Sequence, residues 1–415
     1  MPPKKLMRFY CKQPALGMNW GKSPDWGRIR SINTDTKARI NPQPEFGICM
    51  TTSQPHASGD ARKLALANWV TQQTSPDLHP IQLQSLGSDA GFRRYFRYQS
   101  PSQWLAVDAP PATEDTVQFL AIARLLEQQG VRSPRIAAAD AQQGFLLVED
   151  MGDRLFFRAV NSDNADQLYS QAITTLLQIQ RCNDDPIIPR YDRALLRREL
   201  EIFSEWFVGQ LLGYSLNSEE LQQLDQLFTQ LEDNSLNQPQ SFVHRDYHSR
   251  NLLLVDDGSL GVIDFQGALW GGVTYDLVSL LRDCYLRWPA AQVKRWALEY
   301  RQQAISSGTI PDVSEAEFLR WFDWLGLQRH IKVLGIFARL NLRDGKSGYL
   351  NDLPLVIRYT LEVADEYAEL RPFADWFKQT LLPLAQQQNW YQDYQIAGEQ
   401  ALNKDTAGAQ EVGNK

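Results

Sequence analysis

The sequence contains no long apolar segment, which argues against a membrane-spanning protein. No run of apolar residues approaches the roughly 18 to 20 residues that a membrane helix requires. The basic residues Lys4, Lys5 and Arg8 are not followed by the apolar core of about 7 to 15 residues that a signal peptide needs. We therefore expect a chain that is neither embedded in a membrane nor secreted.

Cysteine and positive charge are also scarce. The 42 basic and 49 acidic residues give a formal net charge of −7, which argues against a surface built to bind nucleic acid. None of the four cysteines shows the spacing of a metal site. They are Cys11, Cys49, Cys182 and Cys284. These features favour a reduced, cytoplasmic protein with free thiols, which we expect to be monomeric.

The two ends of the chain differ in composition from its middle. Residues 1–56 are rich in Lys, Arg, Pro, Gly and Asn and show no helical or strand periodicity. They are expected to be a disordered extension, or the product of a reading frame begun upstream of a natural start at Met50. Residues 386–415 form a C-terminal tail that we expect to be disordered from Asn403 onward. The folded part is therefore predicted to span residues 57–385.

The most informative stretch runs from Ser241 to Gln266. Leu252–Val255 and Gly261–Ile263 are short apolar runs joined by an Asp-Gly turn, a pattern that predicts a β-hairpin. This hairpin would bring Asn251 and Asp264, at its two ends, side by side. Hard oxygen ligands of this kind suit Mg²⁺, which proteins bind with few groups plus substrate phosphates.

Asp246 opens the same stretch and remains free to accept a proton from a substrate hydroxyl. His244-Arg-Asp246-x-x-x-x-Asn251, followed by Asp264, is the layout of phosphoryl-transfer sites. The alternative is an ordinary loop with a solvated aspartate and a capping asparagine. The complete set of residues favours the catalytic interpretation.

Two segments nearer the N-terminus have the character of a nucleotide site. Gly87, Ser88 and Gly91 are small residues between two strand-like runs, as in a loop whose backbone N–H groups approach phosphates. A plain hairpin turn is the alternative. Glu149 and Met151 follow the apolar strand 145–148, where an adenine would hydrogen-bond to backbone. A solvated strand exit is the alternative there.

The remaining pattern is mostly helical and defines the fold class. Thr113 can cap a helix that Gly130 ends. We predict an α+β, bilobal protein, with a small β-sheet lobe at residues 57–150 and a larger, mainly helical lobe at 151–385. The loop of Asp246 would lie in the cleft between the lobes, where ligands most often bind. Residues 275–281 are predicted to open one helix, and further helices are predicted at 165–181, 193–212, 219–231, 291–305, 315–338 and 355–370.

Over residues 58–385 the sequence resembles the aminoglycoside phosphotransferase family, which has the protein-kinase-like fold. Within that family it is most similar to the bacterial anomeric amino-sugar kinases. The Arg-Arg-Tyr-Phe-Arg run and the last of the motifs point to that branch. The resemblance is carried by Gly-Ser-Asp-Ala-Gly-Phe-Arg-Arg-Tyr-Phe-Arg (87–97), Val-Asp-Ala-Pro-Pro (107–111), Leu-Val-Glu-Asp-Met-Gly (147–152), His-Arg-Asp-Tyr-His-Ser-Arg-Asn (244–251), Ile-Asp-Phe-Gln-Gly (263–267) and Gln-Arg-His-Ile-Lys-Val-Leu-Gly-Ile-Phe-Ala-Arg (328–339).

The resemblance implies an ATP- and Mg²⁺-dependent kinase that phosphorylates N-acetylmuramate or N-acetylglucosamine at C1 in peptidoglycan recycling. It assigns Asp246 as the catalytic base, Asn251 and Asp264 as the magnesium ligands, and Asp276 as a buried residue that organises the loop. One position departs from the pattern. Asp108 stands where protein kinases place the lysine that holds the α- and β-phosphates.

Because the other catalytic groups are present, we expect another cation to serve in place of this lysine. Arg93 and Arg94, beside the glycine-rich loop, are the candidates, and solvated strand arginines are the alternative.

The residues that contact the acceptor are less defined by the sequence. His248 either touches the substrate or braces the loop by a hydrogen bond, and His330 either lines the acceptor site or caps a helix. Arg250 and Arg329 are the further candidates. A kinase for an aminoglycoside or choline is the alternative enzyme, and a pseudokinase that binds nucleotide as a scaffold is the alternative from another class.

Overall fold

A five-stranded antiparallel sheet forms the core of the first lobe in this computed structural model, which describes residues 56–74, 81–86, 92–98 and 103–399. The strand order is β1-β2-β3-β5-β4. The strands are β1 (Gln84–Ser85), β2 (Arg94–Arg97), β3 (Trp104–Asp108), β4 (Ile136–Asp140) and β5 (Phe145–Glu149). The sequence did not predict β4, because its Ile-Ala-Ala-Ala-Asp segment has a single β-branched residue and no aromatic one, whereas strands are rich in both types.

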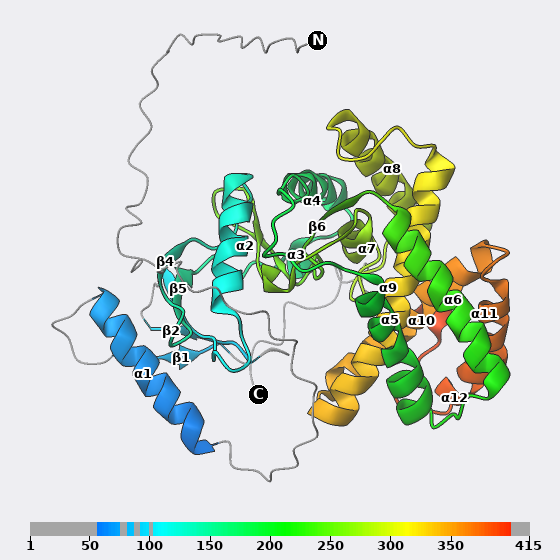
Figure 1. The fold of residues 1–415 in the computed structure, drawn as a ribbon, viewed down its shortest axis with the longest axis horizontal. Helices are drawn as coiled ribbons and strands as arrows, with labels where there is room; N and C mark the ends of the chain where they lie inside the picture. The colour runs from blue at the N-terminus through cyan, green and yellow to red at the C-terminus, as the bar shows by residue number, and fades with distance from the viewer. Residues whose placement is uncertain (1–55, 75–80, 87–91, 99–102, 400–415) are drawn as a thin grey trace, which may run out of the picture. The chain divides into compact units, whose positions relative to one another are not determined.

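Two helices cover opposite faces of this sheet (Figure 1). Helix α1 (His56–Thr74) packs Leu66 and Val70 against the face that includes Leu147. Helix α2 (Thr116–Gln128) packs Ile122 on the other face, with Leu146 and Val148 of the same strand. The buried residues of β5 thus alternate between two cores, as successive strand residues must.

The start of α2 corrects one expectation. Thr113 does not cap this helix, because the N-cap is Asp115, whose side chain accepts a hydrogen bond from the Gln118 N–H. Both residue types are good caps, and the sequence alone did not separate them. The predicted end is confirmed, since Gly130 follows the helix with a φ of +71°.

The second lobe is mainly helical, as predicted, and is arranged around α9 (Glu315–Asp344), a helix of 30 residues. Helices α5, α6, α7, α8 and α10 all pack against it (Figure 1). The other helical segments are α3 (Phe156–Ala159), α4 (Ala165–Ile179), α5 (Arg193–Ile202), η2 (Phe203–Leu211), α6 (Ser218–Asn237), α7 (Tyr275–Leu281), α8 (Ala290–Ser306), η4 (Ser347–Asp352), α10 (Leu353–Glu366), α11 (Arg371–Trp376), η5 (Phe377–Leu381), α12 (Leu382–Ala385) and η6 (Tyr394–Ile396).

Gly335 allows α9 to cross the α5–η2 segment closely. A Cβ atom at this position would lie 2.5 Å from the carbonyl carbon and oxygen of Ile202 and 2.6 Å from the Phe203 nitrogen. No side chain fits at such distances from backbone atoms, so the approach of the two helical segments depends on glycine here.

Two short antiparallel ribbons carry the segments singled out in the sequence. Strand β6 (Gln240–Val243) pairs with β9 (Leu269–Gly272), and the predicted hairpin is confirmed as β7 (Leu252–Leu254) paired with β8 (Leu260–Val262). The short helical turn η3 (Phe265–Gly267) lies between β8 and β9. The ribbons hold the two ends of the predicted catalytic stretch in fixed register.

The chain continues along the helical lobe after α12. Arg358 of α10 donates to the Ala397 carbonyl at 3.0 Å and pairs with Glu399 at 2.9 Å, so residues 386–399 are attached to this lobe. The predicted extension up to residue 55, the expected disorder after Asn403, and the loop residues Gly87, Ser88 and Gly91 lie outside the described residues.

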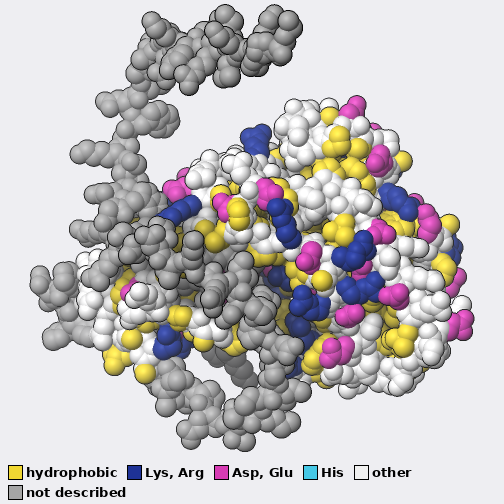
Figure 2. All heavy atoms as spheres, viewed as in Figure 1, with side chains coloured by type: hydrophobic (Ala, Val, Ile, Leu, Met, Phe, Trp, Pro, Cys, Tyr) yellow, Lys and Arg dark blue, Asp and Glu magenta, His cyan; other side chains and the backbone are white. Residues whose placement is uncertain are grey.

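Among the described helices, α9 is the longest, with 30 residues. Among these helices, none is both long and apolar enough to cross a bilayer. On the face drawn in Figure 2, basic and acidic side chains are interspersed over the described surface rather than separated into broad areas of one sign.

Candidate active site

The loop at residues 244–251, called the Asp246 loop below, is held from behind by Asp276. This carboxylate, in the first turn of α7, accepts hydrogen bonds from the backbone N–H groups of His244 at 2.6 Å and Arg245 at 2.9 Å. Burial raises the pKa of Asp276 to about 7, and the charge of Asp246 adds to this effect, although the two N–H groups oppose it. Arg245 has a φ of +80°, a strained conformation for a non-glycine residue, which these two bonds hold in place.

His244 connects the Asp246 loop to the end of β8. Its Nε2 atom donates to the Ile263 carbonyl at 3.0 Å, and its Nδ1 atom accepts from the Asp246 N–H at 3.3 Å, the tautomer being assigned from these partners. Complete burial lowers the pKa of His244 to about 4, so the ring is neutral at physiological pH. This residue is therefore structural.

Asp246 is a half-buried carboxylate in a positive environment. Burial alone would raise its pKa, but the positive charges of His248, Lys332 and Arg245 outweigh that effect and lower the pKa below the usual value of 3.8. Asp246 is therefore ionised at neutral pH. An ionised carboxylate at this position can accept a hydrogen bond from a hydroxyl group and orient it.

A buried network of charges lies behind Asp246, and sequence reasoning did not identify it. Glu199 of α5 pairs with Lys332 of α9 at 2.8 Å, with Arg245, and with the Tyr191 hydroxyl. Burial opposes the ionisation of Glu199, but Lys332 and Arg245 lower its pKa to about 2. The one signal in the sequence was Lys332 within the 328–339 motif, most of which is buried in the structure, and its acidic partner lies in a distant helix.

Asn251 and Asp264 lie side by side, as the predicted hairpin requires. Asn251 Nδ2 donates to the Asp246 carbonyl at 2.9 Å and to Asp264 Oδ2 at 3.3 Å, while Gln266 Nε2 donates to Asp264 Oδ1 at 2.6 Å. Asp264 has a φ of +64°, so it and Arg245 are the two non-glycine residues with positive φ in the described chain.

The oxygens of Asn251 and Asp264 fit a magnesium ion chemically. Within the described ranges, no group of three or more His, Cys, Asp or Glu side chains is arranged to hold a metal. Mg²⁺ does not require such a group, because it is usually bound by one or two carboxylates together with substrate phosphates and water. An amide and a carboxylate beside Asp246 therefore match the donors expected for an ion that enters with a nucleotide.

A cavity of about 1210 Å³ opens beside the exit of β5. Its lining comes from the β1–β2 region, from the connection after β5 and from the β7–β8 turn, and includes Arg97, Met151 and Val255. Met151 has no backbone hydrogen bond among the described residues, so its N–H and C=O are available to a ligand. This is the hydrogen-bonding pattern that the edge of an adenine needs.

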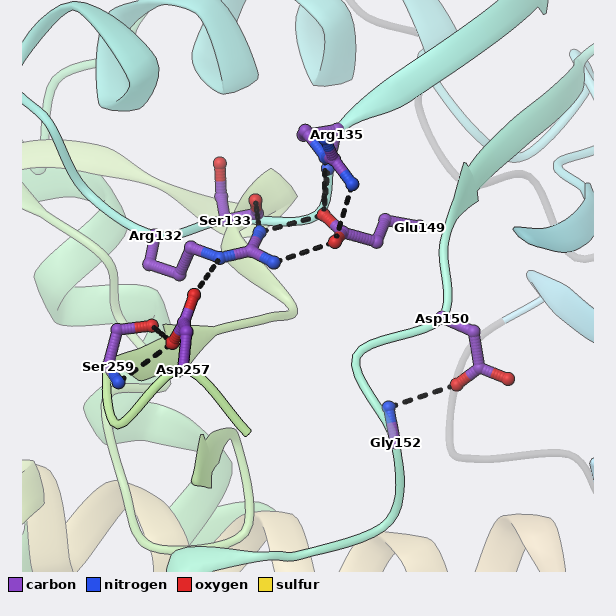
Figure 3. A network of polar contacts seen from close by, with 8 residues as sticks. All are labelled: Arg132, Ser133, Arg135, Glu149, Asp150, Gly152, Asp257 and Ser259. Carbon is purple, nitrogen blue, oxygen red and sulfur yellow. Dashed lines mark hydrogen bonds and ion pairs between the residues drawn. The ribbon is translucent and has the colours of Figure 1, made fainter. Parts of the chain in front are cut away.

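The side chain of Glu149 is bound to two arginines and not directed to a ligand, as Figure 3 shows. Two hydrogen bonds of 2.7 Å join it to Arg132, and Arg135 binds it at 3.1 Å. Burial opposes its ionisation, but these arginines lower its pKa to about 2. Its backbone N–H already donates to the Arg135 carbonyl at 2.8 Å. Of the two predicted adenine contacts, Met151 is thus the one with unused backbone groups.

Arg132 also connects the sheet lobe to the β7–β8 hairpin (Figure 3). Arg132 pairs with Asp257 of the hairpin turn at 3.7 Å, and its carbonyl accepts a hydrogen bond from the Val262 N–H at 2.8 Å. The segment that leads into β4 and the β7–β8 hairpin are therefore connected by direct contacts.

The two arginines proposed to replace the missing lysine have different surroundings. Arg94 lies opposite Asp108 in the β2–β3 register and pairs with it, while Arg62 of α1 pairs with the same buried carboxylate. Asp108 thus stands at the position that the lysine has in protein kinases, but it is an acidic residue that forms ion pairs with two arginines.

Arg93 is buried and points toward α2. It pairs with Glu114 at 2.9 Å, and its guanidinium lies 4.7 Å from the centroid of Phe119, which stacks on Phe265 at 4.9 Å. Its Nε and Nη1 atoms are buried and have no hydrogen-bond partner in the described chain. Because Phe265 follows Asp264 directly, this contact chain brings Arg93 toward the candidate metal ligands.

The four candidate acceptor residues separate into two pairs. Arg329 and His330 lie in the middle of α9 and are buried, with Arg329 donating to Cys284 Sγ at 3.4 Å and His330 Nε2 donating to the Arg282 carbonyl at 3.0 Å. Arg282 is the C-cap residue of α7, so this hydrogen bond is the one expected of His330 if it caps a helix. His248 and Arg250 lie on the Asp246 loop itself.

His248 braces the Asp246 loop through its backbone, since its N–H donates to the Asp246 carbonyl at 3.0 Å and its carbonyl accepts from the Asn251 N–H at 2.9 Å. The ring makes no such bond through its buried Nδ1 atom among the described residues. It instead meets the Tyr285 ring edge to face, with centroids 5.4 Å apart. An unengaged imidazole two residues from Asp246 is available to a bound acceptor.

Comparison with known proteins agrees with this geometry. Residues 82–340 match the model of the phosphotransferase enzyme family. The chain is 42% identical to the N-acetylmuramate/N-acetylglucosamine kinase of Pseudomonas putida over 75% of this chain and 94% of that protein. It is also 42% identical to the protein of the same name from Pseudomonas aeruginosa, over 71% and 88%.

Among solved structures, the ethanolamine kinase of Plasmodium vivax matches with a TM-score of 0.54 at 10% identity, over 74% of this chain and 90% of that one. At that identity the likeness concerns the fold alone, and it confirms the predicted α+β, protein-kinase-like architecture. Together with the extent of the family match and the identity to the two Pseudomonas proteins, it leads to one conclusion: the chain belongs to the phosphotransferase enzyme family.

Proposed function

We propose that this protein is an ATP- and Mg²⁺-dependent kinase that phosphorylates N-acetylmuramate and N-acetylglucosamine at the anomeric C1 hydroxyl. The observation that carries the phosphotransfer chemistry is the position of ionised Asp246 beside the Asn251–Asp264 pair. The names of the two Pseudomonas relatives supply the acceptors. The proposed setting is the cytoplasm, in the recycling of peptidoglycan sugars, where the enzyme acts as a monomer.

Asp246 accepts the hydrogen bond of the acceptor hydroxyl, orients it and takes its proton as the phosphoryl group transfers. The anomeric hydroxyl is the most acidic hydroxyl of such a sugar, which suits a carboxylate of low pKa. Asn251 and Asp264 hold the metal through their side-chain oxygens. When bound, Mg²⁺ neutralises charge on the transferring phosphoryl group.

The nucleotide occupies the cavity beside β5 in this proposal, with the backbone of Met151 reading the adenine edge. Gly87, Ser88 and Gly91 cover the phosphates. Arg93 supplies the cation, because its Nε and Nη1 atoms have no partner in the described chain, whereas Arg94 is already paired with Asp108. Its ion pair with Glu114, which precedes α2, holds it as the equivalent lysine–glutamate pair does in protein kinases.

A screen of acceptors with the full chain tests this function. Free N-acetylmuramate and N-acetylglucosamine, their methyl glycosides, kanamycin and choline are incubated separately with Mg·ATP, and ADP is measured. We expect turnover of the two free sugars, with an acid-labile product that no longer reduces. The methyl glycosides should be inert, because C1 is blocked.

Three results would contradict the proposal in different ways. Phosphorylation of a methyl glycoside at a comparable rate would move the reaction to another hydroxyl. Turnover of kanamycin or choline alone would identify a different kinase. Nucleotide binding without turnover of any acceptor would favour the scaffold, and the Asp246→Asn variant provides the inactive control for every acceptor.

A further inference from the structure

Arg250 is a cation on the Asp246 loop that no acidic residue neutralises through an ion pair in the described chain. It follows Asp246 by four positions and directly precedes Asn251. Its side chain is exposed. Burial raises the pKa of Asp352, at the start of α10, to about 6; the charge of Arg250 opposes this rise, but the two residues form no ion pair. An arginine in such a position has its full hydrogen-bonding capacity available to a ligand.

Two aromatic rings fix the direction of this side chain. The guanidinium carbon lies 3.5 Å from the ring centroid of Tyr285 and 5.0 Å from that of Phe157. The two rings meet edge to face, with centroids 6.4 Å apart. Stacking on aromatic faces leaves the edge of the guanidinium, which carries its N–H groups, free to bind a carboxylate in a bidentate manner.

Backbone contacts join these rings to the Asp246 loop. Buried Asp283 accepts from the Ser249 N–H at 3.0 Å and the Ser249 hydroxyl on one side, and from the Tyr285 N–H at 3.1 Å on the other. Phe157 donates its N–H to the Ser249 carbonyl at 3.0 Å. The arginine, its two rings and Asp246 therefore form one preorganised group rather than a mobile surface side chain.

The Nδ1 atom of His248 is a second unused polar group at the same place. It is buried and has no hydrogen-bond partner in the part of the chain that the structure describes, while its ring contacts Tyr285. An unpartnered buried nitrogen is costly, so a ligand hydroxyl or amide at this point would relieve it. Both free groups flank the carboxylate that orients the acceptor.

These observations select among the acceptors of the proposed function. A cationic acceptor such as choline or an aminoglycoside is disfavoured beside an unneutralised arginine. N-acetylmuramate differs from N-acetylglucosamine by a lactyl ether that carries a carboxylate, and a bidentate arginine is the side chain best suited to that group. We propose that Arg250 binds the lactyl carboxylate and so makes N-acetylmuramate the preferred of the two sugars; this inference rests on the proposed function.

The test compares the two sugars in wild type and in Arg250→Gln. Steady-state ADP release gives kcat/KM for each sugar, and the ratio of N-acetylmuramate to N-acetylglucosamine is the quantity of interest. We expect Arg250→Gln to lower this ratio by about tenfold or more, chiefly through KM for N-acetylmuramate, because a charge-assisted contact is lost. Arg250→Lys should recover part of the ratio, since it keeps the charge without the bidentate geometry.

Two controls separate charge from other effects. Arg295 lies on α8, outside the Asp246 loop, and pairs with Asp166. The Arg295→Gln variant should therefore leave the ratio unchanged. The methyl ester of N-acetylmuramate has the bulk of the substrate without its charge, so Arg250→Gln should not lower its kcat/KM relative to N-acetylglucosamine.

Failure of this inference is distinguishable from failure of the proposed function. Wild type that phosphorylates neither sugar contradicts the proposed function before any variant is made. Wild type that phosphorylates both sugars, with a ratio that Arg250→Gln leaves unchanged, overturns the role of Arg250. An equal loss for the ester and the acid overturns it as well, because the contact would not involve charge.

Discussion

Arg93 gives the sharpest test of how the protein compensates for the absent lysine. Replacing it by methionine removes the guanidinium but keeps an unbranched stem beside Phe119. In the described chain Arg93 has two buried donors without partners, Nε and Nη1, which are available to phosphate oxygens. A charge-assisted hydrogen bond contributes about 1.5–3 kcal/mol, which corresponds to roughly ten- to over a hundredfold in affinity. We expect KM for ATP to rise by about this factor, with little change in KM for the sugar.

The assay is ADP release with ATP varied at saturating sugar and then with sugar varied at saturating ATP. Arg94→Met is the matched control, because Arg62 still neutralises Asp108 when Arg94 is removed. Thermal unfolding accompanies the kinetics, since the loss of Arg93 leaves Glu114 without its ion-pair partner. A folded Arg93→Met protein with an unchanged KM for ATP would refute the reasoning, as would an increase confined to Arg94→Met.

Further expectations concern the chemistry and the scaffold. Asp246→Asn should retain nucleotide binding by calorimetry but lose turnover by about 10²- to 10⁴-fold, and near-normal turnover would remove Asp246 from the mechanism. Asp276→Asn places an amide N–H against one of the two backbone donors and should lower the free energy of unfolding in urea by about 1–3 kcal/mol. We expect kcat to fall more than the affinity for ATP, and equal effects on both would contradict the role of Asp276 in the Asp246 loop. Glu149 has a pKa lowered to about 2, so its stabilisation is present above the unfolded value near 4.5 and is lost as the pH falls. The stability deficit of Glu149→Gln should therefore shrink between pH 7 and pH 3.5, and a constant deficit would exclude this linkage. Gly335→Ala should destabilise by about 1–3 kcal/mol because its Cβ meets the Ile202 backbone at 2.5 Å; a neutral effect in calorimetry would show that α9 can move away.

The parts of the site that depend on local pattern were predictable. Apolar runs around an Asp-Gly turn specify a hairpin and its register, and the register fixes the proximity of Asn251 and Asp264. Likewise, a helix begins at Tyr275, as the pattern of residues 275–281 indicates. In each case the determining contacts lie within a few residues along the chain.

Other features depend on contacts between distant segments. Glu199 and Lys332 come from α5 and α9, and nothing near either residue indicates the pairing. The alanine-rich β4 is a strand because β5 provides its hydrogen-bonding partner. The sequence could not tell whether His330 lines the acceptor site or caps a helix. Its burial and its bond to the Arg282 carbonyl follow from how α9 packs, which only the three-dimensional structure shows. Tertiary packing overrides local propensity at such positions.

The length and contacts of helix α9 determine how the helical lobe unfolds. At about 1.5 Å per residue its 30 residues extend roughly 45 Å, and Lys332, near Asp246, lies on the same continuous segment as the residues that hold α5, α6 and α10. Its central turns cannot open separately without exposing several helix interfaces at once. Their backbone amides should therefore exchange with deuterium only through global unfolding, at a rate shared with the amides of α10, and loss of the Asp246 environment should coincide with loss of the helical lobe as a whole.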